Sequence, residues 1–292
     1  MDENSILKYL SEDEVREFMK EHTLFYGHGK VEKGKFCKLY YGKSASILIK
    51  KMLDICKFWY SDGMSIEYEK EGLILSQKVL AGFKPLEGND DKDLYRIMGK
   101  CVAIFHKNLD TFFPAKHSYP TKYDCSFWRD VISILKLMGK HHIVSKTKLS
   151  ELIMTIYIAV EDIIGENDGG IHGDIHMENV LTDGTGIKLI DFDMMGYGNR
   201  IFDFSVPYLS MLGKEHLFES FVEGYFSERT FFVKWKKFKE ACLLSRIMCI
   251  ISNIDECGNY KWLPFYVENT IEYVKIKLDK MPLGLEIFGW EE

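Results

Sequence analysis

The sequence predicts an α+β protein in which a small antiparallel sheet precedes a larger, mainly helical region. Three observations favour this class. Between Thr23 and Gly82, short runs of aromatic and β-branched residues are separated by glycines, as strands are by turns. After Leu94, apolar residues recur with the period of a helix. One stretch, residues 169–193, interrupts the helical pattern and predicts a β-hairpin.

The first region is expected to contain two helices and an antiparallel sheet. Residues 11–22 carry acids at their start and a lysine near their end, which is typical of a surface helix. The last of the first group of strands is predicted at residues 36–41. Residues 44–60 place polar and apolar side chains on different sides of a helix. Two further strands are predicted on either side of Glu71 and Gly72.

The second region is expected to pack helices around the hairpin. Helical periodicity is clearest at residues 95–109, 126–140 and 148–165. We therefore divide the chain at about Phe83, with a sheet-containing N-terminal lobe in residues 1–83 and a helical C-terminal lobe in residues 84–292.

Composition and charge disfavour several classes of protein. The 292 residues carry a formal net charge of -6, whereas general nucleic-acid binding usually requires a concentrated basic surface. Seven scattered cysteines without metal-ligand spacing indicate reduced thiols in a cytoplasmic protein. The polar, acidic start does not resemble a signal peptide, and no apolar run approaches the roughly 20 residues of a membrane span. We expect a cytoplasmic protein that binds neither nucleic acid nor membrane.

Two acidic motifs flank the predicted hairpin, HGDIHMEN at residues 172–179 and IDFD at residues 190–193. Phosphoryl transfer requires a carboxylate that orients the acceptor hydroxyl and oxygen ligands that hold Mg2+ against the nucleotide phosphates. A hairpin can bring both sets of groups into one cleft. Asp174 would then be the catalytic base, and Asn179 and Asp191 would supply the oxygen ligands that Mg2+ prefers.

The pattern HGDxHxxN followed by IDF resembles the signature of the aminoglycoside phosphotransferase and choline kinase-like family, a branch of the protein-kinase-like superfamily. The likeness extends from about Leu94 to Tyr225. It implies a bilobal protein-kinase-like fold that uses ATP and Mg2+ to phosphorylate a hydroxyl of a small molecule, such as an aminoglycoside, choline or homoserine. The His-Arg-Asp, Asp-Phe-Gly and Ala-Pro-Glu segments of protein kinases do not occur at the corresponding places, which favours a small acceptor.

The resemblance also implies that Asp174 is the catalytic base and that Asn179 and Asp191 bind the metal, and it implies roles for three further residues. Asp193 would provide an additional metal or acceptor contact. His172 and Asp203 would be structural and would brace the catalytic loop.

The lysine that would hold the nucleotide phosphates has two candidates. In one alignment, residues 36–41 are the strand that carries it, Lys38 is the lysine, and the following helix offers Asp54 as its only acid. In the other, residues 45–50 are the strand and Lys50 is the lysine. The helical polar stripe after residue 44 favours Lys38.

The segment LILSQKVLAG resembles the hinge of the family, where backbone groups at Ser76, Gln77 and Lys78 would bind the edge of adenine. Because the phosphate lysine and its acidic partner are ambiguous, the alternative function is a non-catalytic nucleotide-binding or scaffold protein with the same fold. The presence of the base and both metal ligands favours catalysis.

Overall fold

The computed structural model describes most of the chain from residue 80 onward, and separate strands and helical turns before it. The described residues are 27–32, 35–40, 50–51, 54–55, 64–69, 72–78, 80–140, 145–165, 168–230, 233–252, 269–274 and 290–291. The helix predicted at residues 11–22 lies outside them, as does most of the helix predicted at residues 44–60. The four described residues of the second helix are helical.

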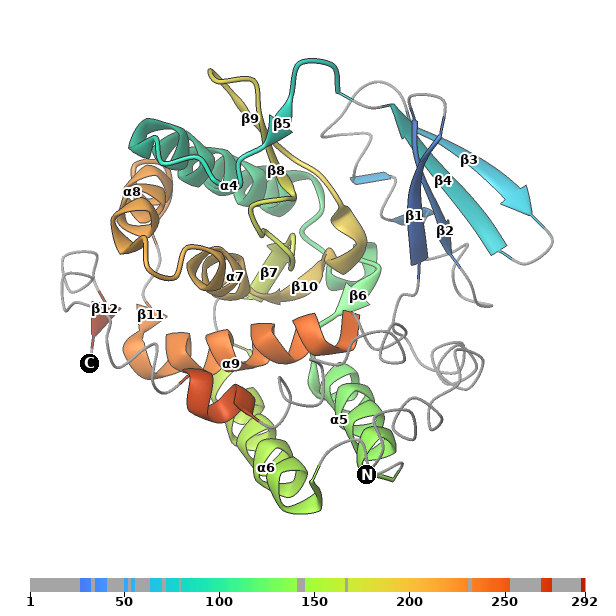
Figure 1. Ribbon diagram of the computed structural model, residues 1–292, viewed down its shortest axis with the longest axis vertical. Coiled ribbons are helices and arrows are strands. Elements are labelled where there is room, and N and C mark those ends of the chain that lie inside the picture. The colour runs from blue at the N-terminus through green and yellow to red at the C-terminus, as the bar shows by residue number, and fades with distance from the viewer. Residues whose placement is uncertain are drawn as a thin grey trace, which may run out of the picture.

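A four-stranded antiparallel sheet forms the N-terminal part of the described structure (Figure 1). Its strands are β1 (Gly27–Glu32), β2 (Lys35–Tyr40), β3 (Met64–Glu69) and β4 (Gly72–Lys78), in the spatial order β1-β2-β4-β3. The strand predicted at residues 36–41 is confirmed as β2. The two strands predicted around Glu71 and Gly72 are confirmed as the β3–β4 hairpin.

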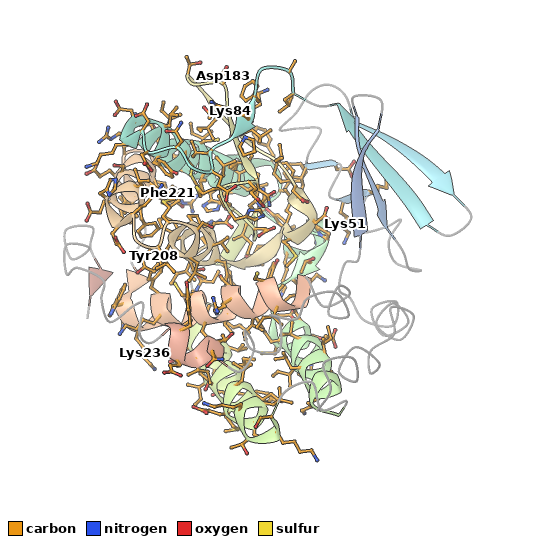
Figure 2. The ribbon with its side chains drawn as sticks, in the orientation of Figure 1. Lys51, Lys84, Asp183, Tyr208, Phe221 and Lys236 are labelled. Atoms are coloured by element: carbon orange, nitrogen blue, oxygen red, sulfur yellow. The ribbon has the colours of Figure 1, made fainter. Side chains whose placement is uncertain are left out.

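The chain leaves this sheet through a turn at Gly82, which has a left-handed φ of 82°, and enters β5 (Lys84–Pro85). This strand pairs with the hairpin of the helical region, because Lys84 lies opposite Thr182. Figure 2 accordingly shows Lys84 close to Asp183 at the hairpin tip. Strand β5 is therefore part of the same small sheet as the hairpin of the helical region.

Two long helices, α4 (Lys92–Phe112) and α8 (Glu215–Phe226), pack along each other on one side of the helical region (Figure 1). Glycines permit this close approach. A β-carbon on Gly99 would lie 1.9 Å from the carbonyl oxygen of Phe221, and one on Gly224 would lie 1.9 Å from that of Arg96. The backbones of the two helices are thus in close contact, which fixes the relative positions of His106 on α4 and Tyr225 on α8.

Two small sheets lie beside α4. One contains β6 (Thr121–Lys122), β10 (Gly196–Asn199) and β7 (Asp168–Ile171), in that order. The other joins β5 to the predicted hairpin, which is confirmed as β8 (Val180–Thr182) and β9 (Ile187–Leu189). The carboxylate of Asp183 closes the hairpin turn by accepting hydrogen bonds from the backbone N–H groups of Thr185 and Gly186.

The remaining helices surround these sheets. They are α5 (Cys125–Lys140), α6 (Lys146–Ile163), α7 (Phe202–Ser210) and α9 (Trp235–Ser252), with two short 3-10 turns at η1 (Lys116–Ser118) and η2 (Phe192–Met194) and a pair of short strands, β11 (Val233–Lys234) and β12 (Trp290–Glu291). Helix α9 packs against both α6 and α7, so it crosses beneath the site (Figure 1). In the described part of the chain, no helix is both long and apolar enough to span a bilayer.

Candidate active site

The loop between β7 and β8 carries Asp174, and its backbone is hydrogen-bonded to Asp203 on α7. The backbone N–H groups of His172 and Gly173 each donate a hydrogen bond of 2.7 Å to the Asp203 carboxylate, one to each oxygen. Gly173 has a left-handed φ of 81°, which turns the chain sharply just before Asp174. These contacts agree with the bracing role expected of Asp203.

Asp203 is fully buried and lies in a network that keeps it ionised. His106 on α4 places Nε2 2.9 Å from Asp203 Oδ2, and its Nδ1 lies 2.8 Å from the hydroxyl of Tyr225 on α8. Burial alone would raise the pKa of Asp203, but the hydrogen bonds that it accepts from His106 and from the backbone N–H of His172 outweigh burial, so the pKa is lowered. Burial lowers the pKa of His106. We therefore assign a neutral imidazole that donates from Nε2 and accepts from Tyr225.

His172 joins the two acidic motifs. Its Nε2 donates to the carbonyl oxygen of Ile190 at 3.0 Å, and its Nδ1 accepts from the backbone N–H of Asp174 at 3.3 Å. Burial lowers the pKa of His172, which favours the neutral ring that this arrangement requires. The ring also packs on Phe192, with centroids 4.8 Å apart. The segments that carry Asp174 and Asp191 are thus held together by one buried side chain.

Asn179 precedes the hairpin and Asp191 follows it, so both lie at its open end, where Asn179 contacts Asp174 directly. The Asn179 amide nitrogen donates to the backbone oxygen of Asp174 at 3.0 Å and to its carboxylate at 3.1 Å, so its oxygen is the atom suited to a metal. The backbone N–H of Ile190 donates to the carbonyl of Asn179 at 2.9 Å. Asp191 has a φ of 60°, and no other non-glycine residue among those described has a positive φ.

The oxygens of these residues fit Mg2+. This ion binds hard oxygen ligands, and proteins often supply only one or two carboxylates because nucleotide phosphates and water complete the shell. Asn179, Asp191 and the neighbouring Asp193 on η2 offer such oxygens. Among the described residues, no three or more His, Cys, Asp or Glu side chains form a group that could hold a metal ion.

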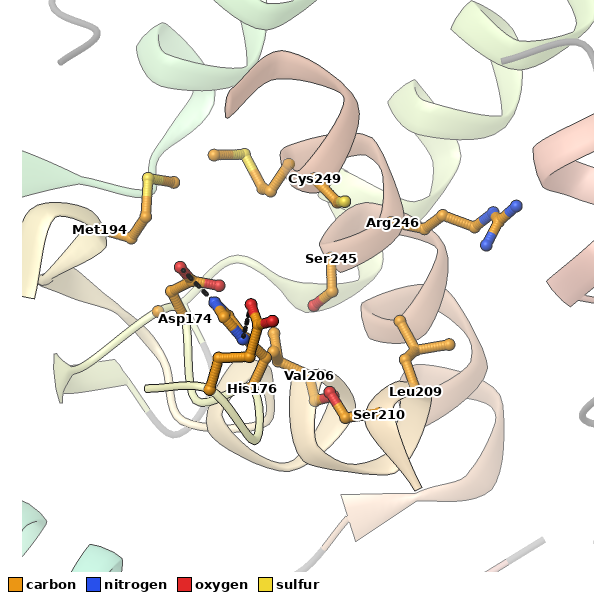
Figure 3. A pocket seen from close by; sticks show the side chains of 12 residues that line it. Asp174, His176, Met194, Val206, Leu209, Ser210, Ser245, Arg246 and Cys249 are labelled. Atoms are coloured by element: carbon orange, nitrogen blue, oxygen red, sulfur yellow. Dashed lines mark hydrogen bonds and ion pairs between the residues drawn. The ribbon is translucent and has the colours of Figure 1, made fainter. Parts of the chain in front are cut away.

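A pocket of about 430 Å³ opens beside Asp174 (Figure 3). The loop that carries Asp174 forms one wall, and η2 and helices α7 and α9 form the others. The Asp174 side chain is 35% exposed, so its carboxylate can be reached from this pocket. His176 lies between two acids, with Nε2 3.6 Å from Asp174 Oδ2 and Nδ1 3.8 Å from Glu178 Oε2. The pocket is large enough for a small metabolite to place a hydroxyl at Asp174.

The residues expected to bind nucleotide lie in the N-terminal sheet. Lys38 is on β2, opposite Leu75 of β4. Lys50 is helical and exposed, whereas the alternative alignment places it at the end of a strand; residues 45–49 of that alignment lie outside the described residues. The helical polar stripe in the sequence had favoured Lys38 for the same reason.

The expected hinge residues also lie on β4. Ser76 pairs with Cys37 of β2 on one side and with Ser65 of β3 on the other. Gln77 is likewise paired on both sides, whereas Lys78 pairs only with β2. The backbone groups of Ser76 and Gln77 are thus used by neighbouring strands, whereas those of Lys78 at the end of β4 are paired on one side.

A family model described as "Phosphotransferase enzyme family" matches residues 72–237, which include both acidic motifs. The chain belongs to the phosphotransferase enzyme family. The family predicted from the sequence is thereby confirmed. No curated protein sequence matches this phosphotransferase.

Solved structures similar to this phosphotransferase confirm the bilobal protein-kinase-like fold. A spectinomycin phosphotransferase, in complex with ADP and spectinomycin, is 16% identical over 92% of this chain and 94% of its own, with a TM-score of 0.52. An amicoumacin kinase, in complex with AMP-PNP and Ca2+, is 12% identical over 97% of both chains, with a TM-score of 0.58. A choline kinase from Streptococcus pneumoniae is 12% identical over 92% and 99%, with a TM-score of 0.58.

Sequence reasoning did not identify His106 and Tyr225 as part of the site of the phosphotransferase. Both lie in helical segments whose likeness to the family was noted, but their contacts are made with residues far along the chain. The sequence did offer one indication: His106 falls on the buried face of α4, and a buried polar side chain requires a hydrogen-bonding partner.

Replacing Gly173 by alanine is expected to lower kcat by at least about tenfold, because the turn beside Asp174 would have to move. A β-carbon there would lie 2.3 Å from the carbonyl oxygen of Met194 and 2.8 Å from the hydroxyl of Tyr123. Gly184→Ala is the matched control, since φ is also left-handed but no atom lies within 4 Å. It should cost about 1 kcal/mol of stability and leave kcat unchanged. Equal kcat values for the two variants would contradict the steric argument.

Proposed function

We propose that the phosphotransferase moves the γ-phosphate of ATP, bound with Mg2+, to a hydroxyl of a small molecule. The observation that carries this proposal is the cluster of Asp174, Asn179 and Asp191 beside an open pocket. Hydrogen bonds from Asn179 to Asp174 and from His172 to Ile190 hold the cluster together. Phosphoryl transfer depends mainly on such positioning and on the neutralisation of phosphate charge.

Each member of the cluster has a role suited to its atoms. Asp174 would orient the acceptor hydroxyl and accept its proton, since its carboxylate faces the pocket. Asn179 and Asp191 would bind Mg2+ through their side-chain oxygens, with Asp193 as an additional metal or acceptor contact. When bound, Mg2+ would supply positive charge to the phosphate oxygens.

We further propose that residues 1–83 form the nucleotide-binding lobe and residues 84–292 the lobe that carries the acceptor site. Support comes from β5, which pairs with the hairpin immediately after the chain leaves the N-terminal sheet. In this proposal Lys38 contacts the nucleotide phosphates. Backbone groups near Lys78 at the end of β4, next to Ser76 and Gln77, face the adenine. ADP and AMP-PNP in two of the similar structures support the choice of nucleotide.

Transfer of label from ATP tests the proposal. The protein is incubated with Mg2+ and ATP labelled either at the γ-phosphate or at the α-phosphate, together with choline, ethanolamine, homoserine and an aminoglycoside. We expect label to move to an alcohol, or slowly to water, only from the γ-position and only with Mg2+. Nucleotide binding without any release of γ-label would instead support the alternative of a non-catalytic nucleotide-binding or scaffold protein.

A further inference from the structure

The hydroxyl of Tyr123 lies between the two acidic motifs. Tyr123 follows β6, and its hydroxyl donates a hydrogen bond of 2.5 Å to the backbone oxygen of Met194, the last residue of η2. A β-carbon built on Gly173 would lie 2.8 Å from the same hydroxyl oxygen. Met194 and Asp174 line the same side of the pocket (Figure 3). One phenolic oxygen therefore lies against both the turn before Asp174 and the segment that follows Asp191.

The aromatic ring of Tyr123 is packed on several sides, so its hydroxyl has a fixed position. Tyr123 is 5% exposed, and its ring centroid lies 4.7 Å from that of Phe127 and 5.8 Å from that of Phe202. β-Carbons on Gly196 and Gly198 of β10 would lie 2.6 and 2.8 Å from its side-chain atoms, so these glycines leave room for the ring. Burial, followed by the charges of nearby carboxylates, raises the pKa of Tyr123 well above its usual value. The hydroxyl therefore keeps its proton and remains a donor.

Two buried side chains hold the backbone of the expected metal-binding segment, one at each end. His172 donates to the backbone oxygen of Ile190, directly before Asp191. Tyr123 donates to the backbone oxygen of Met194, three residues after Asp191. Asp191 has a left-handed φ of 60°, a conformation that persists only where the surrounding structure holds it. The hydrogen bonds from His172 and Tyr123 thus fix the chain on either side of this strained residue.

We propose that Tyr123 is a positioning residue for phosphoryl transfer, and that its hydroxyl sets the place of the metal-binding segment relative to Asp174. The inference rests on the proposed function, because it takes Asp174 as the base and Asp191 as a metal ligand. Tyr123 acts through the backbone of Met194 and not on the substrate. Side chains that orient metal ligands in this indirect way typically contribute 10- to 100-fold, roughly, to metal affinity or activity.

Tyr123→Phe tests this inference, because it removes one oxygen and keeps the packed ring. We expect kcat for an accepted alcohol to fall by at least about tenfold, while KM for the alcohol changes by less than about twofold. The Mg2+ concentration that gives half-maximal ATP binding in titration calorimetry should rise by about tenfold. The second measurement does not require turnover.

Tyr119→Phe is the matched control, because it removes the same atom from another buried tyrosine. Tyr119 is 1% exposed, and its hydroxyl has no hydrogen-bond partner among the described residues. The substitution therefore breaks no hydrogen bond that these residues make, and we expect kcat and the Mg2+ dependence of ATP binding to match those of the wild type. Denaturant unfolding of both variants should show that each is fully folded under the assay conditions.

The outcomes distinguish this inference from the proposed function. If the wild type transfers the γ-phosphate and Tyr123→Phe keeps its kcat and Mg2+ dependence, the inference is overturned and the proposed function stands. An unfolded Tyr123→Phe, or an equal loss of activity in Tyr119→Phe, would also overturn the inference, because the hydroxyl would then have no specific effect on the site. If the wild type binds Mg-ATP but transfers no phosphate, the proposed function fails. A weaker Mg2+ dependence in Tyr123→Phe alone would then support the positioning role, and an unchanged one would overturn it. No ATP binding by the wild type would overturn both.

Discussion

Replacing Asp174 by asparagine is expected to lower kcat by about 1,000-fold, because an amide cannot accept the proton of the acceptor hydroxyl. The change preserves the shape of the side chain, and Asp174 is 35% exposed, so the fold should remain intact. The affinity for Mg-ATP should change little, since the metal ligands in our proposal are Asn179 and Asp191. The measurement is steady-state phosphorylation of an accepted alcohol, together with nucleotide binding.

Asp183→Asn is the control for this substitution. Asp183 occupies the exposed tip of the same hairpin, where an asparagine oxygen can accept the same turn hydrogen bonds. We expect turnover close to that of the wild type. If Asp174→Asn also retained wild-type turnover, Asp174 could not be the catalytic base.

Replacing Asp203 by asparagine is expected to cost about 3 kcal/mol of folding stability, the cost typical of disrupting a buried charged network. The carboxylate of Asp203 accepts from the backbone N–H groups of His172 and Gly173 and from His106. An asparagine offers one oxygen and one NH2 group, so at least one of these buried donors would face another donor. Denaturant unfolding measures the change, and turnover should fall as well because the loop before Asp174 loses its support.

Asp183→Asn again serves as the comparison, because it makes the same change at an exposed position. Its unfolding midpoint should match that of the wild type. A loss of less than about 1 kcal/mol in Asp203→Asn, with normal turnover, would contradict the bracing role of this carboxylate.

The parts of the site that depend on neighbouring residues could be predicted from the sequence. The hairpin, its Asp183-Gly184 turn and the two motifs beside it depend on spacings of a few residues, and the structure agrees with them. The bracing network could not be predicted in the same way. His106 contacts Asp203 across 97 residues and Tyr225 across 119 residues, and only the packing of α4 on α8 brings them together.

The N-terminal sheet shows a different limit of sequence reasoning. Runs of aromatic and β-branched residues bounded by glycines identified β2 and β4, but such runs do not say which backbone groups a neighbouring strand will use. Ser76 and Gln77 therefore proved to be paired on both sides.

The dependence of ATP binding on Mg2+ tests the central claim most directly. Titration calorimetry is performed on the wild type and on Asp191→Asn, with and without Mg2+. The account predicts that Mg2+ strengthens ATP binding to the wild type, and that Asp191→Asn loses this dependence while it folds normally. Equal ATP binding by both proteins with and without Mg2+, or no ATP binding by either, would contradict the assignment of this cluster as a phosphoryl-transfer site.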